Sequence, residues 1–183
     1  MTLANKITVS RFFLTGIFVI LILKPGSIFK ILALSVFIAA SVTDVLDGYF
    51  AKKRNEISAL GKLLDPIADK TLTLSAFITF AVLGIVPAWI VAIITLRELV
   101  ITAFRVIALR RGRVIEAARS GKHKTVSQVV AIYAILIFMV LNVEYEFRNI
   151  VFFMMLATTA LTLISGAGYL SKTREYLFNE KTR

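Results

Sequence analysis

The sequence contains no cysteine and only one histidine. Without cysteine, neither a disulfide framework nor a thiolate metal site can form in this chain. A single histidine also excludes a zinc centre built from several imidazole groups of one chain. The acidic side chains that remain offer hard oxygen ligands and no soft ones, which favours magnesium or manganese.

Acidic residues are also scarce: 11 aspartates and glutamates stand against 22 lysines and arginines, a formal net charge of +11. Nucleic acid is a poor explanation for this charge, because the basic residues lie in segments that flank apolar runs. They gather before residue 12, at 52–62, at 110–124 and after 171, whereas the alternate connections carry only Lys24, Lys30 and Arg148. The positive-inside rule then places both termini and the acidic motifs in the cytoplasm.

Long apolar runs make up most of the chain, since 58% of the residues are hydrophobic and the mean hydropathy is +0.83. Extended through their helical flanks, six of these runs approach the ~20 residues that cross a bilayer. The sequence therefore predicts an all-α, polytopic membrane protein in a single domain over residues 1–183. The six predicted transmembrane helices span roughly residues 8–24, 31–52, 65–85, 88–110, 124–142 and 149–170.

Four aspartates interrupt this apolar pattern: Asp44, Asp47, Asp65 and Asp69. An ionised carboxylate at membrane depth is costly unless it is paired, hydrated or bound to a cation. Asp44 and Asp47 are three residues apart and Asp65 and Asp69 are four apart, so each pair shares one helical face. Two antiparallel helices can bring the pairs together, and the clustered carboxylates then need positive charge. One or two divalent metals meet that need, and such metals most often hold phosphate or pyrophosphate.

Two glycines accompany the aspartates: Gly48 follows Asp47, and Gly61 lies one turn before Asp65. A residue without a side chain allows a ligand to approach the backbone closely. The alternative interpretation is that the four acids are interfacial residues paired with the basic residues at 52–54. The complete spacing, DxxDGxxA followed by GxxxDxxxD, favours the metal site over that alternative.

This pattern resembles the signature of the CDP-alcohol phosphatidyltransferases, DxxDGxxAR followed after eight residues by GxxxDxxxD. The chain departs at one position, because Lys52 stands where the family usually has arginine and so lacks the planar bidentate fork. The resemblance implies six transmembrane helices, a homodimer, and two Mg²⁺ or Mn²⁺ ions per active site. It places that site at the cytoplasmic leaflet of the inner or plasma membrane. An alcohol hydroxyl is expected to displace CMP there from a CDP-linked lipid.

The resemblance also implies roles for individual residues. The expected metal ligands are Asp44, Asp47, Asp65 and Asp69. Asp69, the last aspartate of the signature, is also the expected general base toward the acceptor hydroxyl, and its strength as a base comes mainly from its placement. The CDP-linked lipid is expected to contact Asp44, Gly48, Lys52, Gly61 and Asp65.

A second group of charged residues lies around the fourth and fifth apolar runs. Arg97 and Glu98 are adjacent inside an apolar stretch, Arg105 follows eight residues after Arg97, and Gly121-Lys122-His123-Lys124-Thr125 precedes the next run. Arginine at membrane depth is expected to face a cavity or a partner. Lysines and a threonine near a helix N-terminus form a suitable set for a phosphate. A structural ion pair of Arg97 with Glu98 is the alternative, and His123 is interpreted as an exposed spacer.

The order RE, arginine, then GKxKT, together with the opening NxxTxxR at residues 5–11, is similar to the phosphatidylglycerophosphate synthases of that family. This similarity implies CDP-diacylglycerol and sn-glycerol 3-phosphate as substrates. The residues expected to bind the acceptor phosphate are Arg97, Arg105, Lys122 and Lys124. Two alternatives remain open: a related enzyme of the cardiolipin synthase type, and a divalent-cation transporter. A transporter would distribute carboxylates along a path through the bilayer, whereas these four gather at one mouth.

Overall fold

The computed structural model describes the backbone of residues 3–54, 59–110 and 120–178, and the side chains of residues 10–43, 70–104, 106–107 and 124–169. Within these backbone ranges every regular element is a helix. The helices are α1 (Leu3–Leu23), α2 (Ser27–Arg54), α3 (Ala59–Val82), α4 (Ala88–Arg110), α5 (Ser120–Leu141) and α6 (Arg148–Phe178). The predicted all-α class and the six helices are therefore confirmed.

Several helices extend beyond the predicted bounds. Helix α3 begins at Ala59 instead of residue 65, and α6 continues to Phe178 instead of 170. The predicted bounds follow apolar length, whereas helical hydrogen bonding continues into polar flanks. At its other end α3 stops at Val82, before the predicted residue 85, because Gly84 adopts a φ of 72° that leaves the helical region.

Three short connections turn the chain back on itself. Gly26 (φ 112°) lies between α1 and α2, and Asn142 (φ 57°), a residue type that tolerates this conformation, lies between α5 and α6. Between α3 and α4, Gly84 is followed by Pro87, whose missing N–H removes no helical hydrogen bond at the start of α4. Such short turns leave consecutive helices antiparallel.

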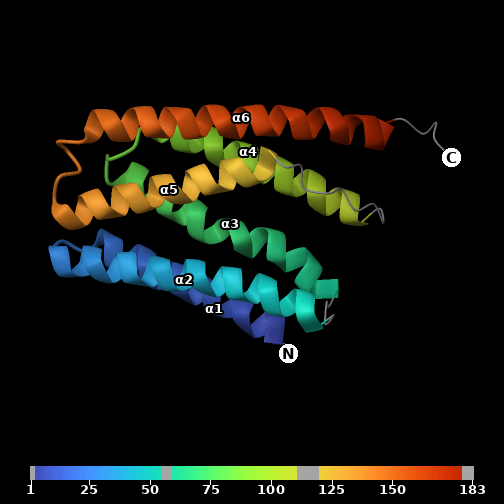
Figure 1. Cartoon of the computed structure of the whole chain (residues 1–183), viewed down its shortest axis with the longest axis horizontal. Helices are drawn as coiled ribbons and strands as arrows, with labels where there is room; N and C mark the ends of the chain where they lie inside the picture. The colour runs from blue at the N-terminus through green and yellow to red at the C-terminus, as the bar shows by residue number, and fades with distance from the viewer. Residues whose placement is uncertain (1–2, 55–58, 111–119, 179–183) are drawn as a thin grey trace.

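The antiparallel order divides the bundle into two ends (Figure 1). The three turns lie at one end, which we call the turn end. The end of α2, the start of α3, the end of α4 and the start of α5 lie toward the other, which we call the motif end because it includes residues 44–54, 59–70 and 120–124. The start of α1 and the end of α6 also lie there, as expected for termini on one side. That this side faces the cytoplasm stays a prediction.

Phenylalanine side chains fill the interior between the helices. Phe18, Phe37, Phe77 and Phe80 are fully buried. Phe37 of α2 contacts Phe18 of α1, with ring centroids 5.5 Å apart, and Tyr133 of α5, with centroids 5.2 Å apart. Tilted and edge-on ring pairs of this kind stabilise beyond the area that they bury. The remaining helices join this core because α4 packs on α3 and α6, and α5 packs on α2 and α6.

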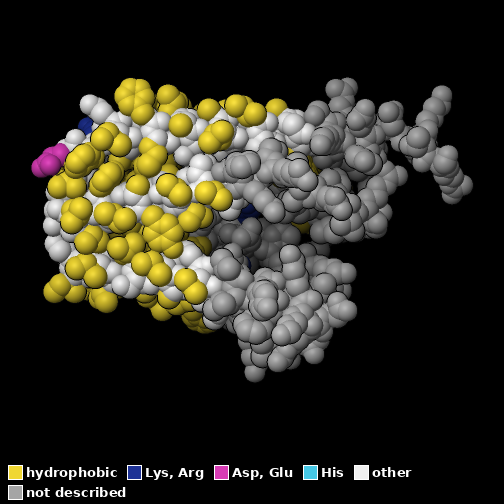
Figure 2. Space-filling model, viewed as in Figure 1, with side chains coloured by type: hydrophobic (Ala, Val, Ile, Leu, Met, Phe, Trp, Pro, Cys, Tyr) yellow, Lys and Arg dark blue, Asp and Glu magenta, His cyan; other side chains and the backbone are white. Residues whose placement is uncertain are grey.

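The outer surface is apolar as well (Figure 2). Exposed side chains spread over the helices include Phe13, Ile28, Val82, Phe153 and Ile164, which are 66% to 72% exposed. Contiguous apolar surface of this extent is rare on soluble monomers and suits contact with lipid. By length and composition, residues 124–141 and 148–169 are long and apolar enough to cross a membrane, and shorter apolar stretches occupy 10–23, 27–43 and 70–82. The other four predicted spans stay predictions.

A polar contact joins α2 to the α5–α6 connection at the turn end. Lys30 Nζ lies 3.2 Å from Glu144 Oε1 and donates to Asn142 Oδ1 at 3.0 Å. Asn142 Nδ2 in turn donates to Ser27 Oγ at 3.1 Å. Glu144 is buried, and Lys30 provides an opposite charge beside its carboxylate. The contact holds the turn end together at the opposite end of the bundle from the acidic motifs.

Candidate functional site

The four predicted metal-binding aspartates lie on two helices that contact each other. Asp44 and Asp47 belong to the last part of α2, and Asp65 and Asp69 belong to the first half of α3. The helical backbone confirms that each pair shares a face, since residues three or four apart are neighbours on a helix. Their side chains lie outside the described residues, and so do those of the predicted lipid-binding residues Gly48, Lys52 and Gly61. Metal and nucleotide binding there stays a prediction.

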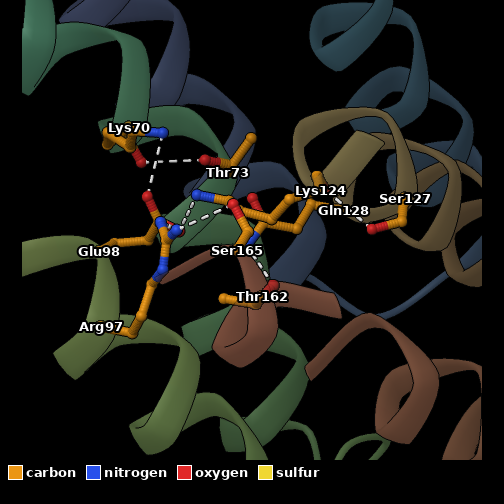
Figure 3. Close-up of polar contacts among 9 residues, drawn as sticks. All are labelled: Lys70, Thr73, Arg97, Glu98, Lys124, Ser127, Gln128, Thr162 and Ser165. Atoms are coloured by element: carbon orange, nitrogen blue, oxygen red, sulfur yellow. Dashed lines mark hydrogen bonds and ion pairs between the residues drawn. The ribbon is translucent and has the colours of Figure 1, made fainter. Parts of the chain in front are cut away.

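Lys70, which immediately follows Asp69 on α3, belongs to a charged cluster centred on the buried Glu98 of α4 (Figure 3). Lys70 Nζ of α3 lies 3.0 Å from Glu98 Oε2. Arg97 Nη1 lies 3.1 Å from Glu98 Oε1, and Lys124 Nζ of α5 donates to the same oxygen. Glu98 is 2% exposed and Lys124 3% exposed. We call Lys70, Arg97, Glu98 and Lys124 the Glu98 cluster.

Helix α6 completes the surroundings of this cluster. Arg97 Nη2 donates to Ser165 Oγ at 3.3 Å, so the guanidinium group joins α4 to α6. Gln128 of α5 reaches the same helix, because its Nε2 lies 3.5 Å from Thr162 Oγ1. Arg97 Nε is buried and has no hydrogen-bond partner among the described residues. A buried donor of this kind is commonly satisfied by water or a ligand.

The cluster carries more positive than negative charge. Three cations and one carboxylate leave two positive charges among these four side chains. Removing several ions from water is expensive, and Glu98 is the carboxylate that these described side chains share. The arrangement is chemically suited to bind a small anion with charge-assisted hydrogen bonds.

The structure brings together two of the four predicted acceptor-binding residues, Arg97 and Lys124. The side chains of Arg105 and Lys122 lie outside the described residues. The alternative ion pair of Arg97 with Glu98 also exists, as one contact of the larger cluster. Sequence reasoning missed Lys70. A signal was available, because Lys70 is a charged residue at the start of the apolar stretch 70–82 and directly follows the last aspartate of the motif.

The sequence of this chain matches a known protein family. The model of the CDP-alcohol phosphatidyltransferase family matches residues 1–164, which include the acidic motifs and the Glu98 cluster. The chain belongs to this family. Membership argues against the divalent-cation transporter that the clustered carboxylates left open.

Individual phosphatidyltransferases of the family are similar over nearly the whole chain. A CDP-diacylglycerol–glycerol-3-phosphate 3-phosphatidyltransferase of Bacillus subtilis (strain 168) is 35% identical over 96% of this chain and 96% of the relative. A probable phosphatidylglycerophosphate synthase of Mycobacterium tuberculosis (strain H37Rv) is 35% identical over 93% of this chain and 80% of the relative. A CDP-diacylglycerol–glycerol-3-phosphate 3-phosphatidyltransferase of Rickettsia typhi is 30% identical over 95% of this chain and 98% of the relative.

We expect Glu98→Gln to lower the free energy of unfolding by about 3–5 kcal/mol, because it leaves the buried Lys124 and the partly buried Lys70 and Arg97 without their shared carboxylate. Chemical denaturation of the purified protein in detergent measures this loss. The matched control is Glu144→Gln, which also removes a buried carboxylate but affects only Lys30, and Lys30 keeps its contact with Asn142. A loss for Glu144→Gln as large as that for Glu98→Gln would contradict the central role of Glu98.

Proposed function

We propose that this protein transfers the phosphatidyl group of CDP-diacylglycerol to sn-glycerol 3-phosphate, giving phosphatidylglycerophosphate and CMP. The observation that carries this proposal is the gathering of Lys70, Arg97 and Lys124 around Glu98, directly beside the helix segment that bears Asp65 and Asp69. The names of the relatives support the same reaction. In this proposal a CDP-linked lipid binds at the aspartates, as the family resemblance implies, and the Glu98 cluster adds an anion site that begins one residue further along α3.

The acceptor phosphate suits this cluster by charge. Glycerol 3-phosphate is small, carries two negative charges near neutral pH and has little apolar surface, so its affinity depends on charge-assisted hydrogen bonds. Arg97 and Lys124 are proposed to donate these bonds, with Lys70 joining them from α3 and with Arg105 and Lys122 as further predicted contacts. Glu98 holds the described cations near one another.

The acidic motifs fit a pair of hard divalent metals. Their donor set is carboxylate oxygen alone, presented as two same-face pairs on the contacting helices α2 and α3. That set suits Mg²⁺ or Mn²⁺, with Asp44, Asp47, Asp65 and Asp69 as ligands. When bound, two such ions would supply positive charge that polarises the phosphoryl group and stabilises the departing CMP. Gly48, Lys52 and Gly61 are proposed to border the nucleotide.

The proposed reaction is a substitution at phosphorus in which the attacking hydroxyl loses one proton. The 1-hydroxyl oxygen of glycerol 3-phosphate forms a bond to the phosphorus that carries diacylglycerol, and the bond from that phosphorus to the bridging oxygen of CMP breaks. Asp69 accepts the proton of the attacking hydroxyl. Lys70 is the next residue on α3, so the proposed proton acceptor Asp69 and one of the cations proposed to bind glycerol 3-phosphate lie on the same helix.

The apolar outer surface supports placement in a membrane. We propose that all six helices span the bilayer, with the motif end at the cytoplasmic leaflet, where both water-soluble glycerol 3-phosphate and the lipid headgroup arrive. This orientation rests on the basic residues at 52–62 and 110–124. A homodimer, as the family resemblance implies, completes the proposed assembly.

The reaction is tested by supplying the purified protein with CDP-diacylglycerol, Mg²⁺ and a panel of alcohols. We expect CMP release with glycerol 3-phosphate, and little with serine, inositol or phosphatidylglycerol, because these acceptors lack a phosphate monoester with two negative charges. Quantification of CMP and of the lipid product measures the preference. Preferential use of phosphatidylglycerol would contradict the proposal and support the cardiolipin synthase alternative.

CMP release is also expected to need a hard divalent metal. Exhaustive chelation should abolish turnover and Mg²⁺ or Mn²⁺ should restore it, while Asp44→Asn or Asp65→Asn should abolish turnover at any metal concentration. Each substitution removes one charged oxygen ligand without changing side-chain size. Full activity after chelation would contradict the metal site. Initial rates with and without added metal provide the measurement.

Lys124→Ala should raise the apparent KM for glycerol 3-phosphate about tenfold or more, the typical effect of losing one hydrogen bond to a charged group. The apparent KM for CDP-diacylglycerol should stay close to that of the unaltered protein. Glu98 keeps two cations in this variant, so the fold is expected to persist. Steady-state kinetics for both substrates, with thermal unfolding in detergent, measure these effects.

Lys30→Ala provides the matched control for that variant. It also removes a lysine that pairs with a buried glutamate, but at the turn end. We expect it to lower stability at least as much as Lys124→Ala and to leave the KM for glycerol 3-phosphate unchanged. If the two variants had the same acceptor KM, Lys124 would be only a structural partner of Glu98.

A further inference from the structure

We infer that Ser165 and Gly166 of α6 are positioning residues that hold the Arg97 guanidinium for the acceptor phosphate. This inference deepens the proposed function and rests on it. It assigns α6 a part in acceptor specificity. The inference depends on the contacts of the two terminal nitrogens of Arg97 and on the space that Gly166 leaves beside this arginine.

The two terminal nitrogens of Arg97 are held from different helices. Nη1 lies 3.1 Å from Glu98 Oε1 on α4, and Nη2 donates to Ser165 Oγ on α6 at 3.3 Å. A planar guanidinium with both ends held has a defined orientation. Ser165 is buried, so little water competes for this hydrogen bond. The third nitrogen of the guanidinium group, Nε, is buried and has no hydrogen-bond partner among the described residues.

Gly166 makes this orientation possible. A Cβ atom added at residue 166 would lie 2.9 Å from Arg97 Nε, 3.3 Å from Cγ and 3.7 Å from Cδ. The contact therefore involves the stem of the arginine as well as its head. A small adjustment of a flexible tip would not relieve it, because Cγ lies close to the backbone of α4. Any side chain at residue 166 must displace Arg97 from its present position.

The same helix contains a matched control. A Cβ atom added at Gly168 would meet no atom within 4 Å, and Gly168 is exposed. Alanine has a higher helix propensity than glycine, so Gly166→Ala and Gly168→Ala should favour the helical backbone about equally. The two substitutions differ in whether the new methyl group meets Arg97.

The experiment measures apparent KM values for both substrates, kcat and thermal stability in detergent for Gly166→Ala and Gly168→Ala, each in the full chain. We expect Gly166→Ala to raise the KM for glycerol 3-phosphate about tenfold, the typical effect of a lost charge-assisted hydrogen bond. The KM for CDP-diacylglycerol should be unchanged. Gly168→Ala should leave both constants unchanged. Equal acceptor KM values for the two variants would overturn the inference.

A double-mutant cycle separates positioning of Arg97 from a general effect of α6. In an Arg97→Ala background, the methyl group of Gly166→Ala has no arginine to displace, so the acceptor KM should not rise further. A further tenfold rise in that background would overturn the inference. Ser165→Ala adds no atom and removes the hydrogen bond to Arg97, so it should raise the KM for glycerol 3-phosphate several-fold. If Gly166→Ala misfolded and Ser165→Ala left this KM unchanged, the inference would also be overturned. If the unaltered protein did not use glycerol 3-phosphate, the proposed function itself would fail.

Discussion

The carboxylate of Glu98 holds cations from two other helices and from its own, and the motif end of the bundle depends on this interaction. Lys70 arrives from α3, Arg97 from α4 and Lys124 from α5. In an apolar bundle, charged side chains such as these are stable only when a group of opposite charge lies beside them. Arg97 extends the set to α6 through Ser165. The relative placement of four helices is therefore linked to one buried acid.

The two ends of the bundle use different means of stabilisation. At the turn end, three short turns and the contact of Lys30 with Glu144 hold the helices in order, and fully buried phenylalanines such as Phe37 fill the space between them. The packing of these phenylalanines involves no charged group. The motif end is free to gather ionised groups because the rest of the bundle already fixes how the helices lie.

Helix α3 connects the two parts of the proposed reaction. Asp69 and Lys70 are neighbours in sequence, and neighbouring residues of a helix point about 100° apart. Lys70 reaches Glu98 on α4, so Asp69 occupies an adjacent sector of the same helix. A nucleotide site and an acceptor site placed on adjacent sectors of one helix would be close without sharing side chains. This placement offers a physical basis for combining a family-wide aspartate motif with an acceptor site of separate residues.

Much of the arrangement was predictable from sequence because it depends on local periodicity. Apolar length predicted six helices in an all-α chain, and spacings of three and four residues predicted the faces shared by Asp44 with Asp47 and by Asp65 with Asp69. Arg97 and Lys124 stood out as charges in apolar surroundings. The tertiary structure alone decided that Lys124 meets Glu98 beside Arg97, that Lys70 joins them, and that Arg97 lies against Gly166. Lys124 and Glu98 are 26 residues apart in the sequence, and Arg97 and its partner Ser165 are 68 residues apart. Such pairs are chosen by how helices pack, and helical periodicity carries no information about the facing helix.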